Sequence, residues 1–186
     1  MDDARRVKIS RYLSRALRHR PDSLDLTLAP GGWVPVDALL AACAERHMAI
    51  TPDELAEVVA LNDKQRFAFD ESGTRIRANQ GHSVEVDLQL EPQTPPDVLF
   101  HGTGHKSVEA IRCDGLHKMS RQHVHLSANI ATALKVGARH GNPVIFRVDA
   151  SRMSQDGHPF YISANGVWLV DRVPAEYLTE LDDSRS

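Results

Sequence analysis

Near the start of the chain, apolar residues recur at the spacing of an amphipathic helix, and basic residues occupy the opposite face. The apolar positions are Ile9, Tyr12, Leu13, Ala16 and Leu17, and the basic positions are Lys8, Arg11, Arg15 and Arg18. Pro21 disfavours helical backbone at the residue before it, so we expect the helix to span residues 4–19. Arg18 and His19 then lie in its last turn, where the helix dipole favours cations.

Turn and capping residues mark the next elements. Residues 31–36 indicate a turn and a short edge strand, and Asp37 is predicted to cap a helix that runs to about residue 46. Thr51, Pro52 and Glu54 form a capping box with proline at the first helical position, which predicts a helix to about residue 61. Runs at residues 66–69 and 75–77 flank a polar turn and predict a hairpin. Helix, short strand, two helices and a hairpin is the element order of a winged helix.

Residues 91–96 hold three prolines and show no periodicity, as expected of an interdomain linker. Strand-like runs then recur at residues 98–100, 124–126, 144–148, 160–162 and 167–170. We expect only two helices among them, near residues 107–112 and 129–139, and Asn165-Gly166 predicts a hairpin. The predicted fold is therefore α+β in two lobes: a winged-helix lobe at residues 1–90, a linker at 91–96 and a β-rich lobe at 97–186 that ends in a frayed tail at 182–186.

The composition narrows the class of protein. The chain has 186 residues, of which 41% are hydrophobic and 25% charged, an ordinary globular balance. It has no stretch of about 18 apolar residues and no apolar segment of a signal peptide near its start, so we expect neither a membrane protein nor a secreted precursor. Cys43 and Cys113 form no Cys-x-x-Cys pair, which is typical of a reduced cytoplasmic protein, and both are predicted to be buried apolar filler.

The charge is uneven along the chain. The net charge is −3, yet residues 1–20 carry seven basic and two acidic side chains. The N-terminal helix is therefore the first candidate for binding an anionic ligand. Seven of the ten histidines stand at or after position 101, which raises the possibility of metal binding or proton transfer in the second half.

Two candidate sites lie in the first half. Arg18 offers bidentate hydrogen bonds to a phosphate, and the adjacent His19 can exchange a proton near neutral pH. A solvated helix end with dipole-matched cations explains the same pair. Arg66 alternates with the apolar Phe67 and Phe69, so it is predicted to point away from the apolar face, toward a groove or simply toward solvent.

Two further candidates lie in the second half. Residues 100–104 (FHGTG) are predicted to follow a strand, where glycines allow close approach of a ligand, although a plain turn fits as well. This run is neither a P-loop nor a dinucleotide fingerprint. His123 and His125 would share one face of a strand, but no third zinc ligand completes the set. Arg121 beside them suits an anion better than a metal ion.

Seven motifs in order along nearly the whole chain resemble the RNA 2′-phosphotransferase family, also called tRNA 2′-phosphotransferase. They are LSRALRH (13–19), GWV (32–34), NDKQRF (62–67), QGHS (80–83), LFHGT (99–103), HVHLS (123–127) and NGVWL (165–169). The resemblance implies a winged-helix RNA lobe followed by an ADP-ribosyltransferase-like lobe that binds NAD. It also implies that an internal RNA 2′-phosphate is moved to NAD, which releases nicotinamide, RNA with a free 2′-OH and ADP-ribose 1″,2″-cyclic phosphate.

The resemblance also carries over individual residues. The family's set around the phosphate corresponds to Arg18, His19, Arg66 and Arg121. The NAD-facing positions correspond to His101, Gly102, Thr103, His125, Leu126 and Ser127. Neither a metal, a membrane nor an obligate protein partner is implied.

The residues suit this chemistry. A 2′-phosphomonoester carries about −1.5 to −2 charge at pH 7, so it needs no general base to attack NAD, and the strand after Asn165-Gly166 has no carboxylate. We expect three arginines from both lobes to hold the phosphate through a 2′-phospho-ADP-ribosylated RNA intermediate and its transesterification, with His19 moving a proton. Two other readings are an ADP-ribosyltransferase that modifies nucleic-acid ends or protein, and a winged-helix DNA-binding regulator. The negative net charge of the chain argues against the DNA-binding regulator.

Overall fold

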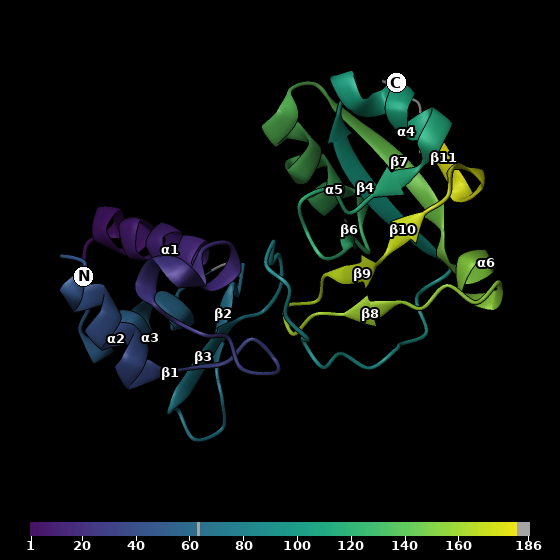
Figure 1. The fold of residues 1–186 in the computed structure, drawn as a ribbon. Helices are drawn as coiled ribbons and strands as arrows, with labels where there is room; N and C mark the ends of the chain where they lie inside the picture. Colours follow the sequence, from purple (N-terminus) through teal and green to yellow (C-terminus); the bar gives the residue numbers. More distant parts are fainter. Residues whose placement is uncertain (63, 182–186) are drawn as a thin grey trace. The chain divides into compact units, whose positions relative to one another are not determined.

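The computed structural model describes residues 1–62 and 64–181, and the chain forms two compact units, Met1–Gln89 and Leu90–Ser186 (Figure 1). The fold is of mixed α and β type, with six α-helices and four small antiparallel sheets in the described residues. Each unit has its own hydrophobic core. The proline-rich run at residues 91–96 falls at the start of the second unit, where the backbone N–H of Gln93 donates to the carbonyl of Phe160 at 2.7 Å.

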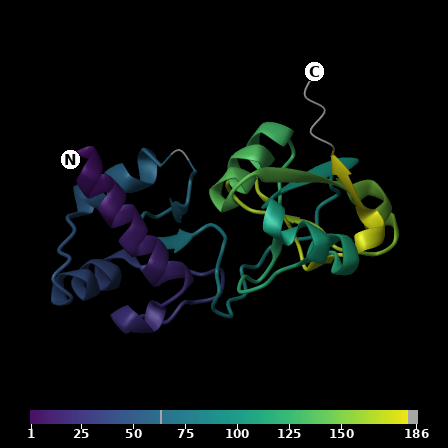
Figure 2. The ribbon, with the colours of Figure 1, turned by 90° about the horizontal axis from the view of Figure 1, so that it is seen from above.

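The first unit is mostly helical with one small sheet. Its elements are α1 (Asp3–Arg18), a 3₁₀ turn (Pro21–Leu24), β1 (Val34–Pro35), α2 (Val36–Glu45), α3 (Pro52–Ala60), β2 (Phe67–Phe69) and β3 (Arg75–Ala78). The sheet order is β1-β3-β2, so β1 is an edge strand as predicted. Figure 2 shows α1 running along the unit beside the other helices. The face of α1 that carries Ile9, Leu13 and Leu17 is fully buried against α2, α3 and the sheet.

The ends of these helices test the capping predictions. Helix α1 ends at Arg18 with His19 as its C-cap, and Thr51 forms the predicted capping box with Glu54. The prediction that Asp37 caps α2 is wrong, because Pro35 is the N-cap and Asp37 lies in the first turn. The N–H of Val36, the first helical residue, donates to the carbonyl of Thr74 at 2.9 Å, so pairing with the chain before β3 satisfies one of the free N–H groups at this helix end.

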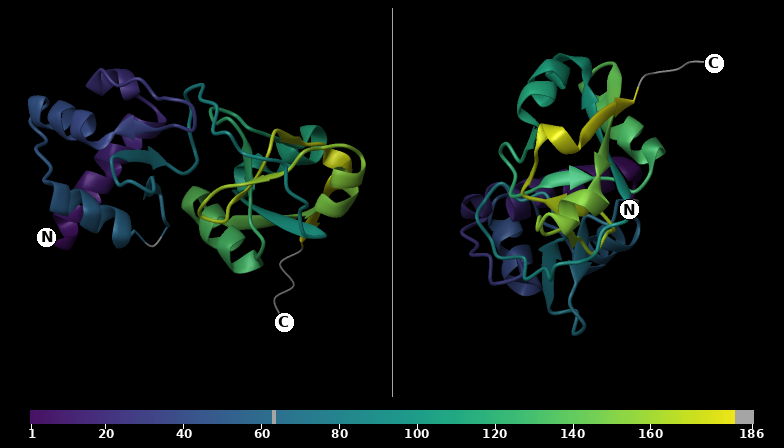
Figure 3. Two further views of the ribbon diagram at one scale, coloured as in Figure 1. Left: turned by 90° about the horizontal axis from the view of Figure 1, so that it is seen from below. Right: turned by 90° about the vertical axis from the view of Figure 1, so that its right-hand side faces the viewer.

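The second unit is built on two three-stranded sheets. Its elements are β4 (Val98–Gly104), α4 (Val108–Asp114), β5 (Leu116–His117), β6 (Val124–Leu126), α5 (Ile130–Gly137), β7 (Pro143–Asp149), α6 (Ala150–Gln155), β8 (Tyr161–Ile162), β9 (Trp168–Val170), β10 (Arg172–Val173) and β11 (Leu178–Leu181), with 3₁₀ turns at His105–Ser107, Ala138–His140 and Ala175–Tyr177. One sheet has the order β11-β7-β4 and the other β6-β9-β8, and β10 pairs with β5. Helix α5 packs on β4 and β7, an arrangement visible from two further directions in Figure 3.

Several predictions for this unit need correction. The expected five strands and two helices are present, and β8 and β9 form the hairpin predicted from Asn165-Gly166. A third helix, α6, and the strands β5, β10 and β11 were not predicted. Residues 100–104 do not follow a strand but form most of β4. The predicted tail at residues 182–186 lies outside the described residues.

The two cysteines differ. Cys43 is buried in the first core, as predicted, and burial raises the pKa of its thiol to about 11. Cys113 is exposed on α4, so the prediction of a buried filler is wrong there. Its helix turns Val108 and Ile111 toward the core instead. Among the residues described, no helix is long and apolar enough to span a membrane.

Candidate active site

The end of α1 brings Arg18 next to Arg66, which enters β2. Arg18 is half-buried, and its Nη2 donates to the backbone carbonyl of Arg66 at 3.4 Å. Its guanidinium carbon lies 6.0 Å from the ring centroid of Phe67, within the range of a cation–π contact. Since His19 follows Arg18 directly, three of the predicted phosphate ligands lie together in the first unit.

Asn62 orients the Arg66 side chain. The Oδ1 atom of Asn62 accepts from Nη1 of Arg66 at 3.1 Å, and its Nδ2 donates to the hydroxyl of Ser10 on α1 at 3.4 Å. The Asn62 amide therefore connects Arg66 to the helix that ends in Arg18. The next residue, Asp63, belongs to the same sequence motif but lies outside the described residues.

The residues that follow β3, here called the 79–83 segment, hold both arginine-bearing stretches. Asn79 donates from its backbone N–H to the carbonyl of Arg66 at 2.9 Å and from Nδ2 to the carbonyl of Gln65 at 2.6 Å. At the other end, the backbone N–H of Ser83 donates to the carbonyl of Arg18 at 2.9 Å. Gly81, with φ +86°, lies alongside the Arg18 side chain, and a Cβ there would be 3.6 Å from Nη1. The segment thus joins the end of α1 to the entry of β2.

Ser83 also contacts the imidazole of His19. The Oγ atom of Ser83 and Nδ1 of His19 are 2.8 Å apart. A hydroxyl can both donate and accept, so this hydrogen bond persists whether Nδ1 carries a proton or not. Ser83 therefore fixes the ring without fixing its tautomer, and proton transfer to a ligand falls to Nε2.

His82 is buried behind these groups. It is 1% exposed, and neither ring nitrogen has a hydrogen-bond partner within the described part of the chain. Burial, and to a lesser extent the nearby charges of Arg18, His19 and Arg77, together lower the pKa of His82 to about 4. The ring is therefore neutral at pH 7 and adds no charge beside Arg18.

In the second unit, backbone pairing brings the motif on β4 next to the motif on β6. The N–H and carbonyl of Phe100 pair with the carbonyl and N–H of Ser127, both at 2.8 Å. His101 therefore lies beside β6, and its Nδ1 is 3.1 Å from the carbonyl oxygen of His125. Because a carbonyl only accepts, Nδ1 of His101 carries the proton and Nε2 is left as an acceptor. Burial keeps this ring neutral by lowering the pKa of His101.

Arg121 contacts the side chain of His125. Its Nη1 lies 3.0 Å from Nδ1 of His125, and because a guanidinium only donates, that nitrogen accepts. The proton of neutral His125 is then on Nε2. Arg121, which was predicted as a phosphate ligand, and two predicted NAD-facing histidines thus lie together in the second unit, with one imidazole presenting an acceptor and the other a donor.

The glycine of the β4 motif serves helix packing. A Cβ on Gly102 would lie 1.7 Å from the carbonyl oxygen of Ala133 in α5, so only glycine allows α5 to lie on the strand. The side of Gly102 on which a Cβ would stand is therefore covered by α5. Thr103 and Leu126 are 8% and 1% exposed.

His123 and His125 have separate surroundings. His123 precedes β6, and its ring packs against Tyr161 with centroids 5.8 Å apart, while His125 contacts Arg121. Within residues 1–62 and 64–181, no group of three or more histidine, cysteine or acidic side chains is arranged to hold a metal ion.

Sequence reasoning assigned no role to Asn62, Asn79, His82 or Ser83. Asn62 stands in the motif NDKQRF, and His82 and Ser83 stand in QGHS, but a motif does not say what its members contact. The only sequence signal for their role is a Gly-His-Ser run soon after a predicted strand, which marks a turn with polar side chains next to a sheet edge.

The family model and the similar proteins found for this chain carry the same description. Residues 4–172 match the family model described as "RNA 2'-phosphotransferase, Tpt1 / KptA family". A protein of Nostoc punctiforme named "Probable RNA 2'-phosphotransferase" is 64% identical over 97% of this chain and 100% of its own length. Proteins of the same name from Herpetosiphon aurantiacus and Streptomyces coelicolor are 55% and 54% identical, each over 96% of this chain and 98% and 97% of their own lengths. The resemblance in the sequence motifs is thus confirmed, and the chain belongs to the RNA 2′-phosphotransferase family of transferases.

Proposed function

We propose that this protein is an NAD-dependent RNA 2′-phosphotransferase. It removes an internal 2′-phosphate from RNA and forms 2′-OH RNA, ADP-ribose 1″,2″-cyclic phosphate and nicotinamide. The observation that carries the proposal is the cluster of Arg18, His19 and Arg66 in the first unit, held together by the 79–83 segment. Membership of the family supports it.

The proposal assigns a lobe to each unit. The first unit has the element order of a winged helix and would bind RNA. The second, with its antiparallel sheets, would be the ADP-ribosyltransferase-like lobe that binds NAD as co-substrate. Its histidines fit such a ligand, because the Nε2 atoms of His101 and His125 supply one acceptor and one donor. His101, Gly102, Thr103, His125, Leu126 and Ser127 are the proposed binding positions. The protein would act in the cytoplasm.

In the first step, a phosphate oxygen forms a bond to C1″ of NAD, the bond from C1″ to the pyridine nitrogen breaks, and nicotinamide leaves. The phosphate is already ionised, so no residue has to remove a proton. The RNA and the dinucleotide are both anionic and repel each other. Arg18, Arg66 and Arg121 would offset this repulsion and hold the phosphate in line with the bond that breaks.

In the second step, the ribose 2″-oxygen forms a bond to phosphorus, and the bond to the RNA 2′-oxygen breaks. One proton leaves the attacking hydroxyl and one proton must reach the RNA oxygen. His19 would move one of these protons through Nε2, because Nδ1 is bonded to Ser83. The guanidinium groups would stabilise the charge that develops on the phosphate, and the reaction would proceed without a metal ion.

The experiment is to incubate the protein with a short RNA that carries one internal 2′-phosphate, with and without NAD. We expect NAD-dependent loss of the phosphate, with nicotinamide and ADP-ribose 1″,2″-cyclic phosphate formed in equal amounts. The same reaction with a chelator present should proceed unchanged.

Product analysis separates this function from the alternatives. A stable ADP-ribosyl adduct on RNA or protein, without cyclic phosphate, would identify an ADP-ribosyltransferase of another kind. Binding of DNA without consumption of NAD would identify a regulator. Either result would overturn the proposal.

A further inference from the structure

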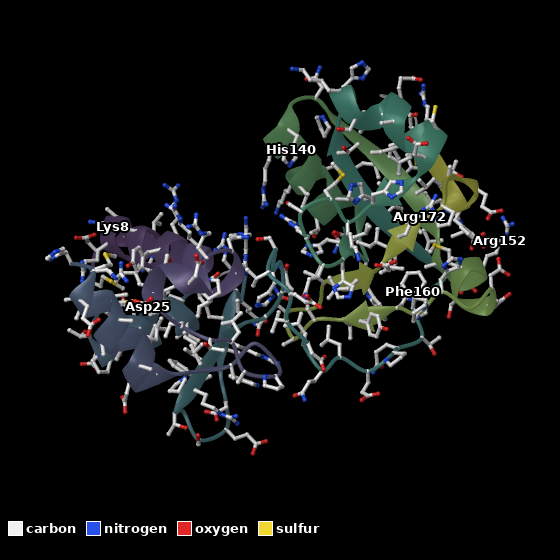
Figure 4. All side chains as sticks on the ribbon, in the orientation of Figure 1. Lys8, Asp25, His140, Arg152, Phe160 and Arg172 are labelled. Atoms are coloured by element: carbon white, nitrogen blue, oxygen red, sulfur yellow. The ribbon has the colours of Figure 1, made fainter. Side chains whose placement is uncertain are left out.

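Helix α1 exposes three basic side chains that no acidic group among the described residues neutralises. Lys8, Arg11 and Arg15 are exposed, and none forms an ion pair with any described residue. Lys8 is labelled in Figure 4, where nitrogen-tipped side chains project from the outer side of this helix. These three residues are here called the α1 stripe.

The two arginines near the start of α1 do have acidic partners, on α3 and, for Arg6, also at Asp3 in α1 itself. Arg5 Nε lies 2.6 Å from Oε1 of Glu54, and Arg6 Nη1 lies 3.8 Å from Oε1 of Glu57. Glu54 is engaged closely enough that the Arg5 guanidinium holds the pKa of that carboxyl at about 2. Glu54 and Glu57 therefore hold α1 at its N-terminal end and do not pair with the α1 stripe.

The stripe leads directly to Arg18. At about 100° per residue, Lys8, Arg11, Arg15 and Arg18 lie within an arc of about 80° on one side of the helix. They span ten residues, or about 15 Å at 1.5 Å per residue. At a rise of about 3.4 Å per nucleotide, this length corresponds to about four stacked nucleotides. The charges are thus in line with the proposed phosphate ligand and extend away from it.

We propose that the α1 stripe binds the phosphodiester backbone of single-stranded RNA next to the 2′-phosphorylated nucleotide. This inference rests on the proposed function, because it takes Arg18 as the ligand of the 2′-phosphate. Charge complementarity favours RNA, since closely spaced cations without acidic partners suit a polyanion. The contacts reach the backbone and not the bases, so they are independent of sequence.

The charges of α3 support this choice of helix. In many winged-helix proteins the helix before the hairpin reads nucleic acid. Here that helix is α3, whose residues Asp53, Glu54 and Glu57 are acidic and which carries no basic residue. An acidic helix repels a phosphate backbone, so α1 takes over the task in this unit.

The experiment compares two substrates. One is a dinucleotide with a 2′-phosphate, and the other is an RNA of about 12 nucleotides with the 2′-phosphate at its centre, which is longer than the stripe. For the triple variant Lys8→Gln, Arg11→Gln, Arg15→Gln, we expect the KM of the longer RNA to rise about tenfold or more at low salt. The KM of the dinucleotide should change by no more than about threefold, because only Arg15, the stripe residue next to Arg18, is within reach of its single phosphodiester.

The salt dependence gives a second measure. Three phosphate contacts on a single strand contribute about 0.7 each to the slope of log affinity against log salt, so the slope should fall by about 2 in the triple variant. Arg46→Gln serves as the control for loss of an exposed arginine outside the stripe, because Arg46 already pairs with Asp25 at 2.7 Å. Arg46→Gln should leave the slope of log affinity against log salt unchanged for either substrate.

The outcomes are distinguishable. If the wild-type protein dephosphorylates neither substrate, the proposed function fails. If the wild type dephosphorylates both and the triple variant keeps the ratio of their KM values, the proposed function stands and the α1 stripe is not an RNA-binding surface. Equal losses on both substrates would also overturn the inference, since the stripe would then act at the 2′-phosphate itself.

Discussion

The two units position their candidate ligands in different ways. In the first unit, Arg18, His19 and Arg66 stand at the end of a helix and at the entry of a strand, and hydrogen bonds from Asn62, Asn79 and Ser83 hold them. In the second unit, His101 and His125 are held by strand pairing and by the close packing of α5 on Gly102.

This difference determines what a substitution does. A polar side chain at the end of α1 can be removed while the core of the first unit remains intact, so the loss should appear in kinetics. A change at β4 disturbs the backbone on which the site is built, so the loss should appear in stability. Kinetic and stability measurements on variants of each unit separate the two cases.

The largest effect is expected from one arginine in each unit. Arg66→Ala and Arg121→Ala should each lower overall turnover about 10²–10³-fold, because in the proposed mechanism each removes a donor aimed at developing charge. If their larger role is in transesterification, phospho-ADP-ribosylated RNA accumulates, which single-turnover mass spectrometry detects. Loss of nicotinamide release alone in both variants would show that the two-step assignment is wrong. Asn62→Ala, which removes a partner of Arg66, should have a smaller effect in the same direction.

Glycine-to-alanine substitutions in the two units should differ in how much they lower the free energy of unfolding. Gly102→Ala should lower the free energy of unfolding of the second unit by about 3 kcal/mol, because the new Cβ meets the Ala133 carbonyl and α5 must shift. Gly81→Ala in the first unit should cost only about 1–2 kcal/mol, the strain of positive φ. Urea unfolding followed by circular dichroism measures both. Equal costs for the two variants would contradict the account of β4.

Acid should weaken the first unit through His82. The folded-state pKa of His82 is about 4, below its ordinary 6.5, so between these values the unfolded chain binds more protons than the folded protein. The stability is complete above about pH 6.5 and is lost as the pH falls toward 4. At about 1.4 kcal/mol per pH unit, the loss between pH 7 and pH 5 is about 2 kcal/mol. His82→Gln should remove this part of the pH dependence. An NMR titration in which His82 of the folded protein protonates near pH 6.5 would contradict this explanation of the acid destabilisation.

The smallest effect is expected at Ser83. Ser83→Ala should lower kcat about tenfold and shift its pH profile, since the His19 ring loses the hydrogen bond that holds it for proton transfer. The stability should change by less than about 1 kcal/mol, because an exposed hydrogen bond contributes little to folding. Ser83→Thr, which keeps the hydroxyl, should restore most of the rate. A kcat and pH profile identical to those of the wild type would show that Ser83 does not position His19.

Local features of the fold were predictable from the sequence. Pro21 ends α1, Thr51 and Glu54 cap α3, and Asn165-Gly166 joins β8 to β9, because each of these signals acts within a few residues. The elements that the sequence did not predict either pair with residues far along the chain or are short. Strand β10 has two residues and pairs with β5, where Arg172 lies opposite His117. Helix α6 has six residues, too few for a periodic pattern.

The candidate site follows the same division. Arg18, His19 and Arg66 could be named from their chemistry and from the family motifs, but the contacts that hold them could not. Ser83 lies 64 positions from His19, and no local rule pairs them. The packing role of Gly102 depends on Ala133 in another element, and no local sequence signal shows that α5 lies there.

The central claim is that Arg18 and Arg66 of the first unit and Arg121 of the second bind one and the same 2′-phosphate. A crystal structure with a bound 2′-phosphorylated dinucleotide tests it most directly. The claim predicts that a guanidinium nitrogen of each arginine lies about 2.7–3.2 Å from an oxygen of that phosphate. A phosphate held by the first unit alone, with Arg121 far from it in every copy, would contradict the claim.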